Sequence, residues 1–332
     1  MKNSNYERFI KGFFINNCAI VDKNKLLFVV YEVNNDPSSS MSTSTVKLVS
    51  YDFNPEKIGQ LGWTGGTRYL KISYDSNEER SIVVDFDSGI WESKQDNYNF
   101  PLYELPNKKN TFSIHDLITI DKTIYAVGRP RKLFKRTSHK QWLDITDPKK
   151  FPLPYKDIEK AKKSGRILDL DFGFNSADGF NEKDIYACGD AGDLWHFNGS
   201  NWRQLDIPCN VSLNCILCAD DGFVYIAGDL GVIYKGINDK WEKIEQSLTK
   251  VSFINITSFK GILYISTENG LYQYKDYIFW RVGFDKGDIQ TSFNWVTSNS
   301  EILVSYGPDQ ALVFDGNKWI QVIGPPSKQE TK

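Results

Sequence analysis

The sequence predicts an all-β fold built from a unit that repeats every 39 residues. Glycines in expected turns keep this step at Gly192, Gly231 and Gly270. Two series of large apolar residues keep the same step: Tyr186, Tyr225, Tyr264 and Leu303, and Trp202, Trp241, Trp280 and Trp319. Short strands and glycine turns with a period of roughly 40 residues are typical of β-propeller blades. We therefore expect a seven-bladed β-propeller whose blades are four-stranded antiparallel sheets.

One repeat is especially clear, between Asp184 and Gln204. Two strands are expected at Ile185–Cys188 and Leu194–Phe197, separated by a turn that ends at Gly192. A second turn, Asn198-Gly199-Ser200, precedes a third strand that opens at Trp202. Turn residues between short alternating segments are the signature of antiparallel hairpins.

The whole chain, residues 1–332, is expected to form a single propeller domain, because a propeller holds this length as one unit. The blades are expected at about 12–62, 63–106, 111–146, 166–207, 208–246, 247–284 and 285–324.

One insertion interrupts the regular period. Trp142 and Trp202 are 60 residues apart rather than 39, and the extra residues fall at Pro148–Gly165. Tyr155–Ser164 has a helical composition, with Asp157 near its start and a glycine after its end. The sequence therefore predicts one short helix here, residues 148–165.

Composition limits the cellular setting and the partners. The net charge of −2 and the pI near 6.0 leave no basic footprint for nucleic acid. No apolar run is long enough for a transmembrane helix, and the N-terminal region lacks the pattern of a signal peptide. The five cysteines suit free thiols in a reducing compartment. These features indicate a cytoplasmic monomer without a nucleic-acid or membrane partner.

The repeat unit from Ile185 to Trp202 resembles bacterial propeller repeats of the WD-like, kelch-like and BNR (Asp-box) groups. Asp190–Trp195 meets the Asp-box pattern in part and Asp229–Tyr234 less well, since both lack its serine and threonine. The resemblance covers roughly residues 112–323 and implies a propeller fold. It implies no particular activity, because such repeats serve glycosidases, assembly factors and binding scaffolds.

Two repeated features could be functional or structural. Asp190, Asp229 and Glu268 could form a ring of carboxylates for acid–base or metal chemistry. A carboxylate that accepts backbone N–H groups in its own turn, followed by a glycine with positive φ, explains the repeat better. Likewise, the repeated tryptophans are expected to pack neighbouring sheets together rather than to form a binding stripe.

Cysteine and histidine chemistry is weakly supported. Cys215 and Cys218 have a spacing used in zinc sites, but residues three apart on a strand point to opposite faces. His139 and His196 fall in outer hairpins, so only His115 could face the central channel. A structural role is favoured for all three histidines.

Two further sites were weighed against ordinary surface roles. Oxygen ligands between Asp169 and Asp184 could bind calcium, yet Gly173 breaks the EF-hand order, so turn formation is favoured. A sialidase needs clustered arginines, for which the chain offers Arg68, Arg129, Arg131, Arg166 and Arg281. The segment Gly128-Arg129-Pro130 does not match the Arg-Ile-Pro type of signature. We therefore assign no catalytic, cofactor or metal-binding residues and expect no enzyme.

The remaining interpretation is a protein-binding scaffold whose partner docks on one propeller face, since loops carry function on rigid scaffolds. By analogy with bacterial propellers, its specific form is an inhibitor or immunity protein that caps a toxin. The alternative is a carbohydrate-binding or glycosidase (sialidase-like) propeller. The insertion combines an aromatic with cations, and the third blade carries arginines in place of the acidic turn. The predicted partner-binding residues are Tyr155, Lys156, Lys160, Lys163, Arg129 and Arg131.

Overall fold

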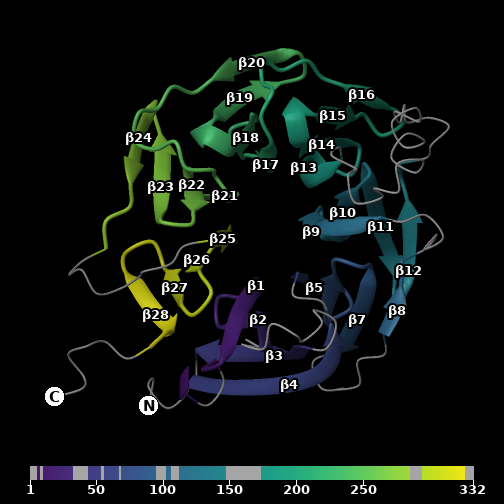
Figure 1. Ribbon diagram of the computed structural model, residues 1–332, viewed down its shortest axis with the longest axis vertical. Coiled ribbons are helices and arrows are strands. Elements are labelled where there is room, and N and C mark those ends of the chain that lie inside the picture. The colour runs from purple at the N-terminus through teal and green to yellow at the C-terminus, as the bar shows by residue number, and fades with distance from the viewer. Residues whose placement is uncertain are drawn as a thin grey trace.

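A computed structural model shows seven sheets arranged as a ring around a central axis (Figure 1). It describes residues 6–7, 10–32, 44–53, 56–66, 69–94, 102–105, 112–146, 173–284 and 294–325. Each sheet consists of four strands that are consecutive in the chain and pair antiparallel, so the sheets follow one another around the ring in sequence order. The prediction of a seven-bladed propeller with four-stranded antiparallel blades is confirmed.

The first three sheets contain β1 to β12. Sheet 1 consists of β1 (Phe13–Asp22), β2 (Lys25–Glu32), β3 (Ser44–Phe53) and β4 (Glu56–Gly66). Sheet 2 consists of β5 (Leu70–Asp75), β6 (Arg80–Asp85), β7 (Gly89–Lys94) and β8 (Leu102–Glu104). Sheet 3 consists of β9 (Ser113–Ile120), β10 (Thr123–Arg129), β11 (Lys132–Ser138) and β12 (Gln141–Asp144).

The other four sheets contain β13 to β28 and two 3-10 turns. Sheet 4 consists of β13 (Phe174–Asn181), β14 (Asp184–Gly189), β15 (Leu194–Phe197) and β16 (Trp202–Gln204), with η2 (Asp190–Gly192). Sheet 5 consists of β17 (Leu213–Cys218), β18 (Val224–Gly228), β19 (Ile233–Ile237) and β20 (Lys240–Lys243), with η3 (Asp229–Gly231). Sheet 6 consists of β21 (Asn255–Phe259), β22 (Ile262–Thr267), β23 (Gly270–Lys275) and β24 (Ile278–Arg281). Sheet 7 consists of β25 (Trp295–Ser298), β26 (Leu303–Tyr306), β27 (Ala311–Phe314) and β28 (Trp319–Ile323).

The three strands predicted within Asp184–Gln204 are β14, β15 and β16. The first sheet extends further than expected, because β4 pairs with β3 as far as Gly66 and thereby moves the boundary to sheet 2 past residue 62. The predicted helix in Pro148–Gly165 lies outside the described residues.

The buried core is divided into seven clusters, one between each pair of neighbouring sheets. Three of the repeated tryptophans pack at these interfaces as predicted. Trp202 lies between sheets 3 and 4, Trp241 packs against the cluster between sheets 4 and 5, and Trp319 packs against the cluster between sheets 6 and 7. Trp202 also donates its indole N–H to the carbonyl of Ile145 in the preceding sheet, at 3.1 Å. Trp241, Trp280 and Trp319 are all half-buried, and Trp280 belongs to none of the seven clusters.

The ring closes between sheet 1 and sheet 7 through side-chain packing and a few hydrogen bonds. Ile10, buried ahead of β1, shares a cluster with residues of β26 and β27. The backbone N–H of Ile15 donates to the carbonyl of Pro308 at 2.7 Å, and Asn17 Nδ2 donates to Tyr306 Oη at 3.1 Å. Among the described residues, each sheet uses only its own four strands, so this closure involves no exchanged strand.

The turn glycines behave as predicted in two sheets of three. Gly192 and Gly231 have φ values of +76° and +70°, whereas Gly270 does not adopt a positive φ. The turn of sheet 6 is instead built on Thr267, whose hydroxyl donates to the Gly270 carbonyl and accepts from the Asn269 N–H. The prediction of a positive φ at Gly270 was wrong because a serine/threonine-type turn replaces the glycine turn there.

We expect Gly192→Ala to destabilise the fold more than Gly222→Ala. Both glycines have positive φ, but a Cβ on Gly192 would lie 2.1 Å from the Cys209 carbonyl oxygen, while a Cβ on Gly222 would meet nothing within 4 Å. Gly222→Ala should therefore cost about 1–2 kcal/mol and Gly192→Ala about 2–5 kcal/mol. Urea unfolding measures both values, and equal losses would contradict the close approach.

Candidate functional site

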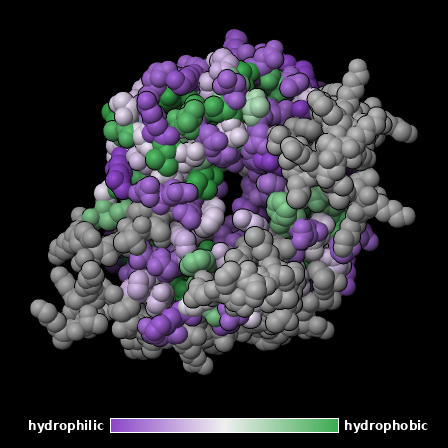
Figure 2. Space-filling model, viewed as in Figure 1, coloured by the Kyte–Doolittle hydropathy of each residue, from purple (hydrophilic) through white to green (hydrophobic). Residues whose placement is uncertain are grey.

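The two ends of the ring present different loops. We call top face the one that bears the turn between the second and third strands of each sheet together with the connections between sheets. The bottom face bears the other two turns of each sheet. Figure 2 shows the opening at the centre of the ring, with hydrophilic residues along part of its rim.

A channel of about 470 Å³ runs along the inner strands of all seven sheets. Asp116 and Asp178 are among its lining residues. Asp178 accepts the backbone N–H groups of Cys218 and Gly179, both at 2.8 Å. Burial raises the pKa of Asp178 to about 7 in spite of these two hydrogen bonds, and the negative charge of Asp116 contributes to the increase.

At its top end the channel widens into a mouth of about 270 Å³ lined by six of the sheets. Arg129, at the end of β10, occupies the place that Asp190 has in the next sheet. Its Nη2 pairs with Asp190 Oδ2 at 2.5 Å and donates to the side chain of Asn175. The arginine that departs from the acidic turn pattern thus links two neighbouring sheets.

The repeated aspartates are held by asparagines of the inner strands. Asn175 Nδ2 donates to Asp190 Oδ1 and to the carbonyl of Leu213 in the next sheet, both at 3.0 Å. Asn214 Nδ2 repeats this pattern with Asp229 Oδ1 and the Phe253 carbonyl, both at 2.9 Å.

These bonds correct the expected turn chemistry. Among the described residues, the carboxylate of Asp190 is bound by Asn175 and Arg129 and that of Asp229 by Asn214, rather than by the N–H groups of their own turns. They orient the asparagines that tie sheet 4 to sheet 5 and sheet 5 to the segment that leads into sheet 6.

His115 lines the mouth, as expected for the histidine that could face the channel. Burial, with the positive charges of Arg129 and Lys71, lowers its pKa to about 4. The imidazole is therefore neutral at pH 7, and its Nε2 shares a hydrogen bond of 3.1 Å with the Ser113 hydroxyl. These contacts agree with the favoured structural role.

The predicted partner-binding residues fall into three situations. Arg129 lies in the mouth. Arg131 is only 9% exposed, pairs with both carboxylate oxygens of Asp193 at 2.8 and 3.0 Å, and lies over the ring of Trp195. This burial leaves Arg131 little surface for a partner. The remaining four lie outside the described residues: Tyr155, Lys156, Lys160 and Lys163.

The arginines weighed for a sialidase do not converge within the described chain. Arg129 and Arg131 bind separate carboxylates, and Arg281 donates to the Asn269 carbonyl on sheet 6. Arg68 and Arg166 lie outside the described residues.

The oxygen-bearing residues before Asp184 also have separate partners. Asn181 accepts the Lys183 N–H at 2.9 Å, and Asp184 binds His196 at 2.7 Å. Asp169 and Asp171 are not described. Within the described ranges, no three histidine, cysteine or acidic side chains are placed to hold a metal ion.

The cysteine pair is placed as the strand argument predicted. Cys215 and Cys218 both lie on β17, and their side chains belong to different clusters on opposite faces of sheet 5. Burial raises the pKa of both thiols. All five cysteines are free thiols. No helix in the described parts of the chain is long and apolar enough to cross a membrane.

Sequence reasoning missed an apolar patch on the top face. Leu230, Leu248 and Val251 are 65%, 53% and 40% exposed. Gln246 joins their two loops, since its Nε2 donates to the carbonyls of Gly231 and Thr249. Leu230 occupies the turn position of Ala191, one repeat later, and its φ is +57°. We call Leu230, Leu248 and Val251 the top patch.

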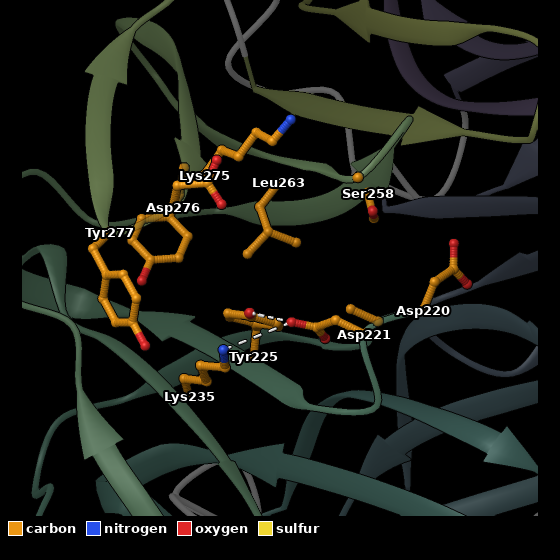
Figure 3. A pocket seen from close by; sticks show the side chains of 12 residues that line it. Asp220, Asp221, Tyr225, Lys235, Ser258, Leu263, Lys275, Asp276 and Tyr277 are labelled. Carbon is orange, nitrogen blue, oxygen red and sulfur yellow. Dashed lines mark hydrogen bonds and ion pairs between the residues drawn. The ribbon is translucent and has the colours of Figure 1, made fainter.

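Sequence reasoning also missed a pocket of about 240 Å³ on the bottom face between sheets 5 and 6. Figure 3 shows Tyr277 on one side of it, Leu263 projecting from above, and Asp221 with Tyr225 and Lys235 below. Tyr225 Oη donates to Asp221 at 2.7 Å. Lys235 Nζ lies 3.7 Å from the same carboxylate. We call this cavity the bottom pocket.

Comparison with known proteins supports the fold and gives one functional lead. No protein-family model matches the chain. A stretch of 203 residues, 61% of the chain, is 28% identical to the immune protein Tsi7 of Pseudomonas aeruginosa. The match spans 62% of that relative, which is less than two thirds of its length.

Solved β-propellers resemble the chain in fold alone. The WD40 β-propeller domain of Doa1 superposes with a TM-score of 0.61 at 13% identity, covering 94% of this chain and 93% of that one. U3-55K gives 0.60 at 8% identity over 89% of each chain. YCF48 bound to D1 peptide gives 0.52 at 12% identity, over 75% of this chain and 79% of that one. The predicted resemblance to propeller repeat proteins is confirmed.

We expect Asp178 to make stability depend on pH. An aspartate in an unfolded chain has a pKa of about 4, so between pH 4 and 7 only the folded protein holds this proton. Stability should therefore fall as pH rises through this interval, by at most ~1.4 kcal/mol per pH unit. Asp178→Asn, which mimics the protonated acid, should remove this component. Urea unfolding from pH 4 to 7 tests this, and an unchanged slope in the variant would contradict it.

Proposed function

We propose that this protein is a non-enzymatic binding scaffold that neutralises another protein by docking it on one propeller face, as an immunity protein does with a toxin. The observation that carries the proposal is the 28% identity to an immune protein over 203 residues. The rigid ring adds support, because a scaffold whose loops are held in place loses little conformational entropy on binding.

The arrangement of the mouth favours binding over catalysis. Arg129, Asp190 and Asn175 bond to one another, and Asp229 is held by Asn214. His115, the histidine that lines the mouth, has a lowered pKa and a serine partner within its own strand. Arg129, Asn175 and Asn214 join neighbouring sheets, and the other groups hold residues within one sheet, which is a different task from that of a nucleophile and base aimed at a substrate.

The top patch is the part of the described surface that best fits such a docking face. Its three apolar side chains are exposed beside the polar mouth, which is the usual combination of an apolar centre and a polar rim in an interface. Gln246 holds both patch loops through four hydrogen bonds. Leu230 gains no burial, and its left-handed backbone is unfavourable for leucine, so contact with a partner explains this residue.

Tyr155, Lys156, Lys160 and Lys163 remain predicted partner contacts. They belong to the connection between sheets 3 and 4. The described residues that flank this connection, Thr146 and Gly173, lie at the top face with the mouth.

The proposed function can be tested by producing this protein together with each protein that is encoded beside it in the genome. Each protein encoded beside this chain would be produced in a bacterial host with and without it, and growth would be recorded. We expect one neighbour to stop growth alone and to be tolerated when the chain is present. The proposal would be contradicted if none of the neighbouring proteins were toxic. It would also be contradicted if some were toxic and this protein protected the host against none of them. A search for hydrolysis of aryl glycosides and sialosides covers the glycosidase alternative.

We expect Leu230→Asn to weaken partner binding at least tenfold without loss of stability. Asparagine tolerates a positive φ, so the free energy of unfolding should stay equal or rise by up to about 1 kcal/mol. Ala191→Asn, the same turn position one sheet earlier, is the matched control and should keep full binding. Calorimetric titration with the identified partner measures both variants. Equal binding by Leu230→Asn and the control would exclude the top patch as the docking face.

A further inference from the structure

The turn between the last two strands of a sheet has a position that requires a left-handed backbone. In sheets 4 to 7 this position recurs every 39 residues and has φ values of +86°, +52°, +65° and +99°. Glycine fills it in sheets 4 and 7, as Gly199 and Gly316, and asparagine fills it in sheet 5, as Asn238. Both residue types tolerate this conformation. Sheet 6 places Tyr277 there.

Tyr277 gains nothing from the fold in return for this backbone. It is 83% exposed, the highest value among the large hydrophobic residues of the described chain, and Ile278 beside it is 62% exposed. A tyrosine held in a strained backbone and left in water is explained by contact with something outside the chain. Its ring borders the bottom pocket (Figure 3).

The bottom pocket already accommodates one cation of the protein itself. Lys235 Nζ lies 4.1 Å from the centre of the Phe223 ring, 5.4 Å from that of Tyr225, and 3.7 Å from the carboxylate of Asp221. Aromatic faces beside a carboxylate form the environment that attracts ammonium and guanidinium groups. The opposite wall repeats these components with Tyr274, Tyr277 and Asp276.

On that opposite wall the one cation among the lining residues is Lys275. Lys275 directs its side chain away from the cavity (Figure 3). Asp220 and Asp276 form no hydrogen bond or ion pair with any described residue. The cavity is lined by three aspartates, Asp220, Asp221 and Asp276, and by two lysines, Lys235 and Lys275, so its negative side chains outnumber its positive ones. Burial raises the pKa of Tyr274, and the carboxylates of Glu242 and Asp221 add to this increase. An incoming positive charge is therefore favoured over an anion or a purely apolar group.

We propose that the bottom pocket binds a basic side chain, arginine or lysine, presented by a segment of another protein. The aliphatic stem would lie along Leu263 and the ring of Tyr277, while the charged end would reach the carboxylates of Asp276 and Asp221. A volume of about 240 Å³ suits one such side chain and the residues next to it in the bound segment, rather than a folded domain. This site is independent of the proposed function, because it lies on the face opposite the top patch.

Short peptides test the proposal directly. The full chain, labelled with ¹⁵N and deuterated, would be titrated with acetyl-Gly-Arg-Gly-amide, with the lysine analogue, and with acetyl-Gly-Gln-Gly-amide as the neutral control. We expect saturable amide shifts in the millimolar range for the two basic peptides. The shifts should be confined to residues around 219–225, 258–263 and 274–278, and the glutamine peptide should cause none.

Tyr277→Asn separates binding from folding. Asparagine is the residue that sheet 5 uses at this turn position, so the melting temperature should stay equal or rise while the affinity for the arginine peptide falls at least tenfold. Asp276→Asn should lower the affinity at least threefold through loss of charge alone. Asn238→Gly, the matched control at the turn of sheet 5, should bind the peptide like the wild type.

Four results would overturn the proposal. The first two are an absence of saturable shifts with the basic peptides and equal shifts with the glutamine peptide. The others are wild-type affinity of Tyr277→Asn for the arginine peptide, and shifts of these residues by a neutral monosaccharide but not by the basic peptides. Each readout uses the chain without any partner. Their failure therefore leaves the growth-protection assay unaffected, and failure of that assay leaves the bottom pocket unaffected.

Discussion

The burial of each sheet against its two neighbours is the constraint on which the whole structure depends. A four-stranded sheet of this size has two apolar faces, and no helix of the described chain covers either of them. The seven buried clusters each take residues from two successive sheets, so no sheet has a core of its own. The last of these interfaces, between sheets 1 and 7, joins the two ends of the chain. It consists of side-chain packing around Ile10 and a small number of hydrogen bonds such as Asn17 to Tyr306. The ring is therefore a cooperative unit, and its core is formed by the sheets rather than by the loops.

The same constraint explains the polar groups around the channel. The inner strands converge there, and the start of an inner strand approaches the end of the second strand of its sheet so closely that a Cβ on Gly189 would lie 1.8 Å from the Gly173 carbonyl. Asn175 and Asn214 bridge these close approaches by donating both to a turn aspartate and to the next sheet. In sheet 6 a serine, Ser266, donates to the Asn294 carbonyl and provides the link instead. Several polar groups of the mouth thus link neighbouring sheets of the ring, among them Arg129, Asn175 and Asn214.

The sequence was sufficient for the architecture because the 39-residue period reports strands, turns and interfaces together. It also placed Cys215 and Cys218 on opposite faces and His115 at the channel. It was insufficient wherever the outcome depended on backbone conformation or on contacts between sheets. The partner of Asp190 is an asparagine from a neighbouring strand, which no local pattern indicates. Tyr277 stands in register with Gly199 and Gly316, a signal visible in the sequence. Its meaning, a left-handed backbone under an exposed ring, requires the φ angles and the exposed area.

Both proposed binding positions rest on breaks in the repeat rather than on the repeat itself. Residues that recur in register serve every interface equally and cannot distinguish one region of the ring from another. Leu230 and Tyr277 depart from the residue type that their turns favour, and neither gains burial within the chain. Leu230 belongs to the top of sheet 5 and Tyr277 to the bottom of sheet 6, so at least the length of a strand, roughly 15 Å for five residues, separates them. A compact segment bound at one position does not reach the other. The two proposed binding positions are therefore separate and lie on neighbouring sheets, one on each face of the ring.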